Sequence, residues 1–217
     1  MSTSRVQTKI CGLSTPETIA AALAGRAAFL GFNFFPKSPR YVTAEAAARL
    51  AAPARGPAKI VAVTVDPTDA ELDEIAKVLG PDLIQLHGTE TPARAHAVQA
   101  RTGAEVIKVL SVADASDIEA ARHFDGTVAH LMFDARPPKG SPLPGGVGAR
   151  FDWTLLAGRR FQRPWFLAGG LDPWNVEEAI SLSGAPIVDV SSGVERGPGL
   201  KDPALIAAFL DAVRRVA

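Results

Sequence analysis

Short runs of apolar residues alternate with longer amphipathic stretches along the whole chain. The apolar runs are rich in Val, Ile, Leu and Phe, and they begin near Val6, Phe29, Lys59, Leu83, Glu105, His130, Trp165 and Pro186. The stretches between them are alanine-rich with charges at helical spacing, and they cover residues 16–25, 43–52, 69–79, 92–101, 115–123, 151–157, 175–182 and 203–216. The pattern therefore predicts eight strands in strict alternation with eight helices.

The length of the connections between the apolar runs decides the kind of sheet. They are too long for hairpins, but they suit the crossovers between parallel strands. Strict alternation is typical of a parallel sheet covered by helices, which is an α/β fold. Eight such units in 217 residues favour a closed (β/α)8 TIM barrel over an open sheet. The sequence thus predicts a single barrel domain over residues 1–217, with its active site at the C-terminal face.

Capping residues support the predicted helix starts. Thr15 precedes Pro16, and Asp172-Pro173 and Asp202-Pro203 repeat the combination of a capping side chain and a first-turn proline. The one long irregular stretch, residues 135–150, is rich in proline and glycine. Such a segment in a compact domain is either a functional loop over the site or a solvated insertion.

Charge and cysteine content exclude several classes of protein. The 23 Lys and Arg balance the 23 Asp and Glu, whereas nucleic-acid or anionic membrane surfaces need a clustered cationic excess. The single cysteine cannot form an internal disulfide, which favours a reducing compartment. Charges, Gly or Pro interrupt every apolar run, and the first residues lack the apolar stretch of a signal peptide. We therefore expect a cytoplasmic protein with no nucleic-acid or membrane partner.

Polar residues at the ends of predicted strands are the candidates for chemistry, because barrel sites form there. Cys11 follows the first strand and is either a buried small side chain or a thiolate base. Asp134 follows the sixth strand and is either a general acid or a cap for the loop. Arg40 is a solvated side chain or a carboxylate clamp. His87 titrates near neutrality or is held by hydrogen bonds at the start of a loop.

The last strand and two glycine-rich turns complete the candidate site. Alternation along residues 187–191 predicts that the side chain of Asp189 points into the barrel. Lys9 lies on the adjacent strand, so we expect the two side chains to form a buried ion pair. Such a pair is more simply structural than catalytic. The turns Gly169-Gly170 and Ser191-Ser192-Gly193 follow strands seven and eight, the common phosphate site of barrel enzymes. Ser192 and Glu195 also match a capping box, which predicts a short helix there.

Ten segments together resemble the phosphoribosylanthranilate isomerase family of tryptophan biosynthesis. They are KICGL at 9–13, GFNFF at 31–35, SPRYV at 38–42, LIQLHG at 83–88, FD at 133–134, GGVG at 145–148, FDW at 151–153, LAGGL at 167–171, DVSSGVE at 189–195 and PGLKD at 198–202. The resemblance spans essentially the whole chain. It departs from the family pattern at Val147, where threonine is usual, and at Trp174, where glutamate is more usual.

The resemblance implies an aldose–ketose isomerase that performs an Amadori rearrangement of N-(5-phosphoribosyl)anthranilate. It implies Cys11 as general base, Asp134 as general acid, and Arg40 as the group that holds the anthranilate carboxylate. Substrate binding falls to Arg40 and to residues of the last two strand ends, which are Gly169, Gly170, Asp189, Ser191, Ser192 and Gly193. The resemblance implies no cofactor and no metal.

Two other interpretations of the same sequence remain. One is another phosphate-binding barrel enzyme of the indole-glycerol-phosphate synthase or histidine-pathway isomerase type, although a cysteine on the first strand disfavours the latter. The other is a catalytically silent barrel that only binds a ligand, which would have no need of both an acid and a base. Alanine-rich helical faces suit either a monomer or a homodimer.

Overall fold

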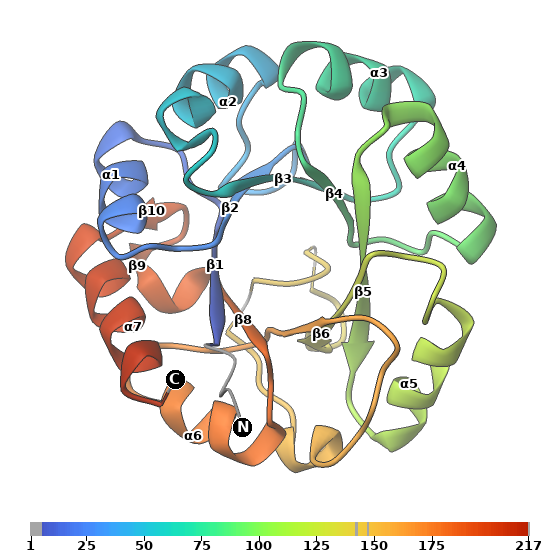
Figure 1. The fold of residues 1–217 in the computed structure, drawn as a ribbon, viewed down its shortest axis with the longest axis vertical. Coiled ribbons are helices and arrows are strands. Elements are labelled where there is room, and N and C mark those ends of the chain that lie inside the picture. The colour runs from blue at the N-terminus through green and yellow to red at the C-terminus, as the bar shows by residue number, and fades with distance from the viewer. Residues whose placement is uncertain (1–5, 142, 147, 217) are drawn as a thin grey trace.

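Eight parallel strands close into a barrel in chain order in this computed structural model, which describes residues 6–141, 143–146 and 148–216. Figure 1 looks down the barrel, with the strands at the centre and the helices in a ring around them. The strands are β1 Gln7–Cys11, β2 Phe29–Asn33, β3 Lys59–Thr64, β4 Leu83–Leu86, β5 Glu105–Val112, β6 His130–Ala135, β7 Trp165–Leu167 and β8 Ile187–Val190. The predicted α/β fold and the closed (β/α)8 barrel are confirmed.

Helices cover the outside of the barrel. Within the described residues these are α1 Pro16–Ala24, α2 Ala44–Ala51, α3 Asp69–Val78, α4 Pro92–Thr102, α5 Ala115–Glu119, α6 Val176–Ser183 and α7 Pro203–Arg215. Four 3₁₀ turns accompany them, at η1 Ala52–Ala54, η2 Ala120–His123, η3 Trp153–Leu156 and η4 Ser192–Val194. As predicted, Thr15 caps α1 and Asp202 caps α7, since each side chain accepts a hydrogen bond from a backbone amide of the first turn.

One predicted helix and one predicted helix start are wrong. The stretch 151–157 forms only the 3₁₀ turn η3, because Asp152 caps it and Gly158, at φ +69°, stops it one turn later. Asp172-Pro173 does not start α6, which begins at Val176. Asp172 instead accepts a hydrogen bond from the Trp174 amide and takes another from the Asn175 side chain, so these residues form a separate turn.

Alternation along the strands separates two apolar layers. One face of the strands points outward and packs under the helices, where the largest buried side chains include Phe32, Phe133 and Phe209. The other face fills the barrel with a second cluster that includes Phe29, Met132 and Phe166. The barrel interior is therefore a packed core below the site, as is usual in this fold.

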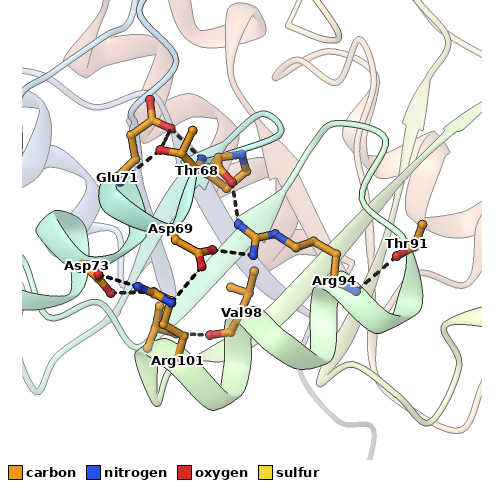
Figure 2. A network of polar contacts seen from close by, with 10 residues as sticks. Thr68, Asp69, Glu71, Asp73, Thr91, Arg94, Val98 and Arg101 are labelled. Carbon is orange, nitrogen blue, oxygen red and sulfur yellow. Dashed lines mark hydrogen bonds and ion pairs between the residues drawn. The ribbon is translucent and has the colours of Figure 1, made fainter.

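Ion pairs on the surface join α3 to α4, as Figure 2 shows. Arg94 donates to Asp69 at 2.6 Å and to the Pro67 carbonyl oxygen at 2.7 Å. Arg101 bridges Asp69 and Asp73 with bonds of 2.7 to 2.8 Å. These side chains are about one third to one half exposed, so solvent and salt screen their attraction and the network mainly fixes how the two helices lie side by side.

Two additions to the regular barrel lie at its C-terminal face. The irregular segment after β6, yellow in Figure 1, lies inside the ring of helices, and Val147 of its GGVG motif is outside the described residues. After β8, the short strands β9 Glu195–Gly197 and β10 Leu200–Lys201 pair as an antiparallel hairpin that the sequence did not predict. In the described part of the chain, every helix is too short or too polar to cross a membrane.

Candidate active site

The predicted site residues meet around one cavity at the C-terminal end of the strands. Eight of the nine predicted site residues line it, namely Cys11, Arg40, Asp134, Gly169, Gly170, Asp189, Ser191 and Ser192, and the ninth, Gly193, lines the adjoining cavity. These residues come from five different strand ends or the loops that follow them, so only closure of the barrel brings them together.

Cys11 ends β1 and faces the barrel interior beside Lys9, two residues earlier. Lys9 is fully buried and donates a 2.8 Å hydrogen bond to Asp189, as the sequence predicted for this pair. Burial raises the pKa of the Cys11 thiol, and the charge of Asp189 adds to that rise. The charges of Lys9 and Lys201 act in the opposite direction and favour the thiolate. Two cations thus oppose the cost of placing a negative sulfur in the barrel.

Asp134 is the penultimate residue of β6, and its carboxyl faces the cavity next to His87. The His87 Nε2 atom lies 3.2 Å from Asp134 Oδ2, and both side chains are almost buried. The backbone amide of His87 donates to the Thr64 carbonyl oxygen at 2.9 Å, which anchors the start of the loop after β4. The sequence predicted that anchoring, but it gave no sign of the contact with Asp134, because the two residues come from strands that are not neighbours.

Arg40 forms a forked ion pair with Glu195 at the cavity wall. Its Nε and Nη2 atoms donate to the two carboxylate oxygens at 2.7 and 2.8 Å, and Nη2 also donates to the Gly146 carbonyl oxygen at 3.2 Å. Lys201 donates to the same carboxylate and, at 3.1 Å, to the Ser191 carbonyl oxygen. Glu195 is thus shared by two buried cations, while the Nη1 atom of Arg40 makes no hydrogen bond to any residue that the structure describes.

Burial and ion pairing have opposite effects on the pKa values of Glu195 and Lys201. Burial alone would raise the pKa of Glu195, but the hydrogen bonds from Arg40 and the charge of Lys201 outweigh it and hold the pKa below its ordinary value. Burial lowers the pKa of Lys201, and the nearby Glu195 carboxylate offsets only part of that decrease. The Glu195 side chain is therefore an acceptor for two cations.

The predicted capping box at Ser192 and Glu195 is wrong. The segment after β8 forms only the 3₁₀ turn η4, and neither side chain caps it. Glu195 instead begins β9, which turns its carboxylate toward Arg40 and Lys201. The local sequence matches a capping box, but two buried cations provide stronger partners for a carboxylate than backbone amides do.

Glycines shape the two turns that follow β7 and β8. Gly169 and Gly170 have φ values of +88° and +65°, a region that L-residues with side chains rarely adopt. A Cβ on Gly193 would overlap the Leu171 carbonyl oxygen, so the two turns pack backbone against backbone. Arg150, from the segment after β6, donates to the Gly170 carbonyl oxygen at 3.1 Å and joins that segment to the turn.

A further buried ion pair, which the sequence analysis missed, stabilises the loop after β4. Lys108 donates to Glu90 at 2.6 Å and to the Gly88 carbonyl oxygen at 2.8 Å. Glu90 in turn accepts hydrogen bonds from the amides of Gly88 and Asp66. The pair holds the loop that starts at His87. Alternation along β5 could have indicated it, since Lys108 is the one charged residue inside an otherwise apolar run.

The irregular segment after β6 lies against the cavity. Leu143, Pro144, Gly145, Gly146, Gly148 and Ala149 line it, so this segment covers the site rather than extending into solvent. A Cβ on Gly145 would contact the Asp134 carboxylate and lie 2.7 Å from His87 Cε1. Among the residues that the structure describes, no group of three or more His, Cys, Asp or Glu is arranged to hold a metal ion.

Comparison of the chain with known proteins identifies its family. The N-(5'phosphoribosyl)anthranilate (PRA) isomerase family matches residues 8–212. The chain is 67% identical over 212 residues to the N-(5'-phosphoribosyl)anthranilate isomerase of Caulobacter sp. (strain K31), with 97% of this chain and 100% of the relative covered.

Two solved structures show the same fold, and one of them contains a ligand. Phosphoribosyl anthranilate isomerase from Thermotoga maritima superimposes with a TM-score of 0.86 at 32% identity, over 97% of this chain and 99% of that chain. A structure of phosphoribosyl anthranilate isomerase in complex with reduced 1-(o-carboxyphenylamino)-1-deoxyribulose 5-phosphate superimposes with a TM-score of 0.83 at 31% identity, with the same coverage.

Proposed function

Since the chain belongs to the N-(5'-phosphoribosyl)anthranilate isomerase family, we propose that Cys11 and Asp134 perform the acid–base chemistry of its reaction. The protein is an aldose–ketose isomerase of tryptophan biosynthesis and acts on a small-molecule substrate. It converts N-(5-phosphoribosyl)anthranilate to 1-(2-carboxyphenylamino)-1-deoxyribulose 5-phosphate. The observation that carries the proposal is that the Cys11 thiol and the Asp134 carboxyl line one cavity from two strands, β1 and β6, that are not neighbours.

The first step needs an acid at the ribose ring oxygen. Asp134 gives its proton to that oxygen, the bond from the oxygen to C1′ breaks, and the nitrogen lone pair forms the C1′ Schiff base. His87 lies beside the carboxyl, with its Nε2 atom 3.2 Å from Asp134 Oδ2. General acid assistance of this kind contributes about 10²–10⁴-fold to rate.

The second step needs a base at C2′. The Cys11 thiolate takes the C2′ proton and becomes a thiol, and the electrons of the C–H bond move to the Schiff base to give an enolamine. The enolamine then loses its hydroxyl proton and gains one at C1′, which yields the ketone. Each step moves protons between the substrate and side chains of this chain, so the balance requires no oxidant or reductant.

Binding of the substrate is assigned to the groups around the acid and the base. The turns at Gly169-Gly170 and Ser192-Gly193 follow β7 and β8, the position at which other barrels bind a phosphate. The free Nη1 atom of Arg40 suits the anthranilate carboxylate. Asp189 gives one oxygen to Lys9, and its other oxygen suits a sugar hydroxyl. The reduced product analogue bound by a relative carries the same phosphate and carboxylate groups.

Steady-state kinetics of two variants test these roles. We expect Cys11→Ala and Asp134→Asn each to lower kcat by about 10²–10⁴-fold while KM changes little, because each loses a proton transfer and keeps the binding groups. Lys139→Ala is the control. Lys139 is exposed in the irregular segment after β6, and this variant should have the kcat and KM of the wild type. Turnover close to that of the parent in either acid–base variant would disprove the assignment of that residue.

A further inference from the structure

Lys9 is the most deeply buried charged side chain of the site. It is 0% exposed, and its one carboxylate contact is the 2.8 Å bond to Asp189 across the β1–β8 closure. An ammonium group has three N–H donors, so this bond leaves donors free. A buried ion pair of this kind costs desolvation energy that its own attraction hardly recovers, and it is therefore weak evidence of a purely stabilising role.

The free side of the Lys9 ammonium faces Cys11. The two residues are two apart on β1 and therefore share a face. A Cβ on Gly31, which pairs with Cys11 across β1 and β2, would lie 3.1 Å from Cys11 Sγ and 3.2 Å from Lys9 Nζ. Sulfur and ammonium thus border the same small space, which glycine leaves free of a side chain. Both the charge of Lys9 and a hydrogen bond from it favour the thiolate.

The charged groups around Cys11 carry a net positive charge, which favours a negative charge on its sulfur. The charged groups that act on its sulfur are the cations Lys9 and Lys201 and the carboxylate of Asp189, so these three carry one net positive charge. A thiolate at Cys11 would neutralise this group. Without Lys9 the same thiolate would lie in a buried site beside the Asp189 carboxylate, an arrangement that strongly disfavours a charged sulfur.

We propose that Lys9 is a positioning residue that stabilises the Cys11 thiolate, with Asp189 holding the ammonium in place. The inference rests on the proposed role of Cys11 as the base. It assigns a function in the reaction to a buried pair that the sequence alone explains more simply as structural. In each turnover the thiolate takes the C2′ proton, so Lys9 keeps its own proton and acts through its charge and its hydrogen bond.

The single cysteine makes the test direct, because the ultraviolet absorbance of the thiolate then reports Cys11 alone. Titration of Cys11→Ala supplies the baseline. We expect Lys9→Met to lower the thiolate fraction at neutral pH about tenfold or more, with kcat falling in proportion, KM changing less, and kcat recovering as pH rises. The Lys9→Met/Asp189→Asn double variant removes the unpaired carboxylate that could prevent folding, and its thiolate fraction should fall less than that of the single variant but remain below wild type.

Lys108→Met is the matched control. It breaks a buried lysine–carboxylate pair of similar geometry with Glu90, away from the sulfur, and should leave the thiol titration unchanged. A double variant whose thiol titrates as in the wild type would overturn the proposal, and so would a Lys108→Met shift as large as that of Lys9→Met. If Cys11→Ala itself kept full turnover, the proposed base would be wrong, and the spectroscopic titration would still measure the effect of Lys9 on the sulfur.

Discussion

At the scale of single residues, glycines decide how closely the reactive groups approach one another. Gly145 leaves space beside the Asp134 carboxyl and His87, and Gly31 does the same beside Cys11. A Cβ on Gly12 would lie 2.6 Å from Arg40 Cδ. The acid, the base and the arginine thus each pack against a position where a methyl group would force a side chain to move.

Gly145→Ala tests this arrangement at the acid. Its backbone does not require positive φ, so the added methyl group acts by displacing the Asp134 carboxyl and His87. We expect kcat to fall at least about tenfold, since a small misplacement of a catalytic group is costly, with little change in thermal stability. Kinetics and thermal melting, with Lys139→Ala as the control, measure both effects. Unchanged kcat would show that the carboxyl can shift without loss of function.

At the scale of elements, the β9–β10 hairpin supplies groups that the regular barrel lacks. Glu195 starts β9 and Lys201 ends β10, and together with Arg40 from the loop after β2 they form one buried group. The hairpin is held to that loop as well, since a Cβ on Gly199 would contact the Pro39 carbonyl oxygen. A short insertion after the last strand therefore fixes the orientation of the arginine proposed to bind the carboxylate.

Glu195→Gln should destabilise the protein in a pH-dependent way. The folded-state pKa of Glu195 is lowered, so its contribution to the free energy of unfolding is present above its ordinary pKa of 4.5 and is lost as pH falls through the folded value. We expect a loss of about 3 kcal/mol at neutral pH, because two buried cations lose their shared carboxylate. The difference from wild type should shrink below the ordinary pKa.

Urea unfolding at neutral and acidic pH measures this difference. Glu74→Gln, at an exposed position on α3, is the control and should follow the wild type at both values. A difference that stayed constant with pH would show that Glu195 contributes by packing rather than by charge.

At the scale of the whole molecule, the packed interior of the barrel supports the site above it. Phe166 is fully buried there, with ring centroids 5.1 Å from Phe29 and 5.3 Å from His130. These rings come from strands β2, β6 and β7, so they join parts of the sheet that are not all neighbours. Burial lowers the pKa of His130, which keeps this layer uncharged at neutral pH.

Phe166→Ala should lower the free energy of unfolding by about 3–5 kcal/mol, because the cavity it leaves lies between strands that cannot close over it. If residues 1–217 form one domain, as we predict, loss of secondary structure and loss of tryptophan fluorescence should remain coincident in one transition. Trp174→Ala, at a side chain that is 80% exposed, is the control and should stay within about 0.5 kcal/mol of wild type. Two separate transitions would contradict the single domain.

Several features of this protein follow from the sequence because they depend on local periodicity. The alternation of apolar runs and amphipathic stretches determined all eight strands and the closed barrel. The inward alternation of Lys9 and Asp189 determined their pairing, since closure makes their strands neighbours. Predictions from short-range sequence patterns were wrong where a residue distant in the sequence offered a stronger interaction. Glu195 matches a capping box, but its carboxylate pairs with an arginine 155 positions away.

Only the tertiary structure decided which polar groups meet. His87 and Asp134 come into contact although they follow strands that are not adjacent. Lys108, on β5, forms an ion pair with Glu90 in the loop after β4. The physical reason is that ion pairs and close packing depend on distance in space. Hydrophobic periodicity determines the strand order along the chain, whereas the position of each charge relative to the sulfur and the carboxyl is fixed only when the barrel closes.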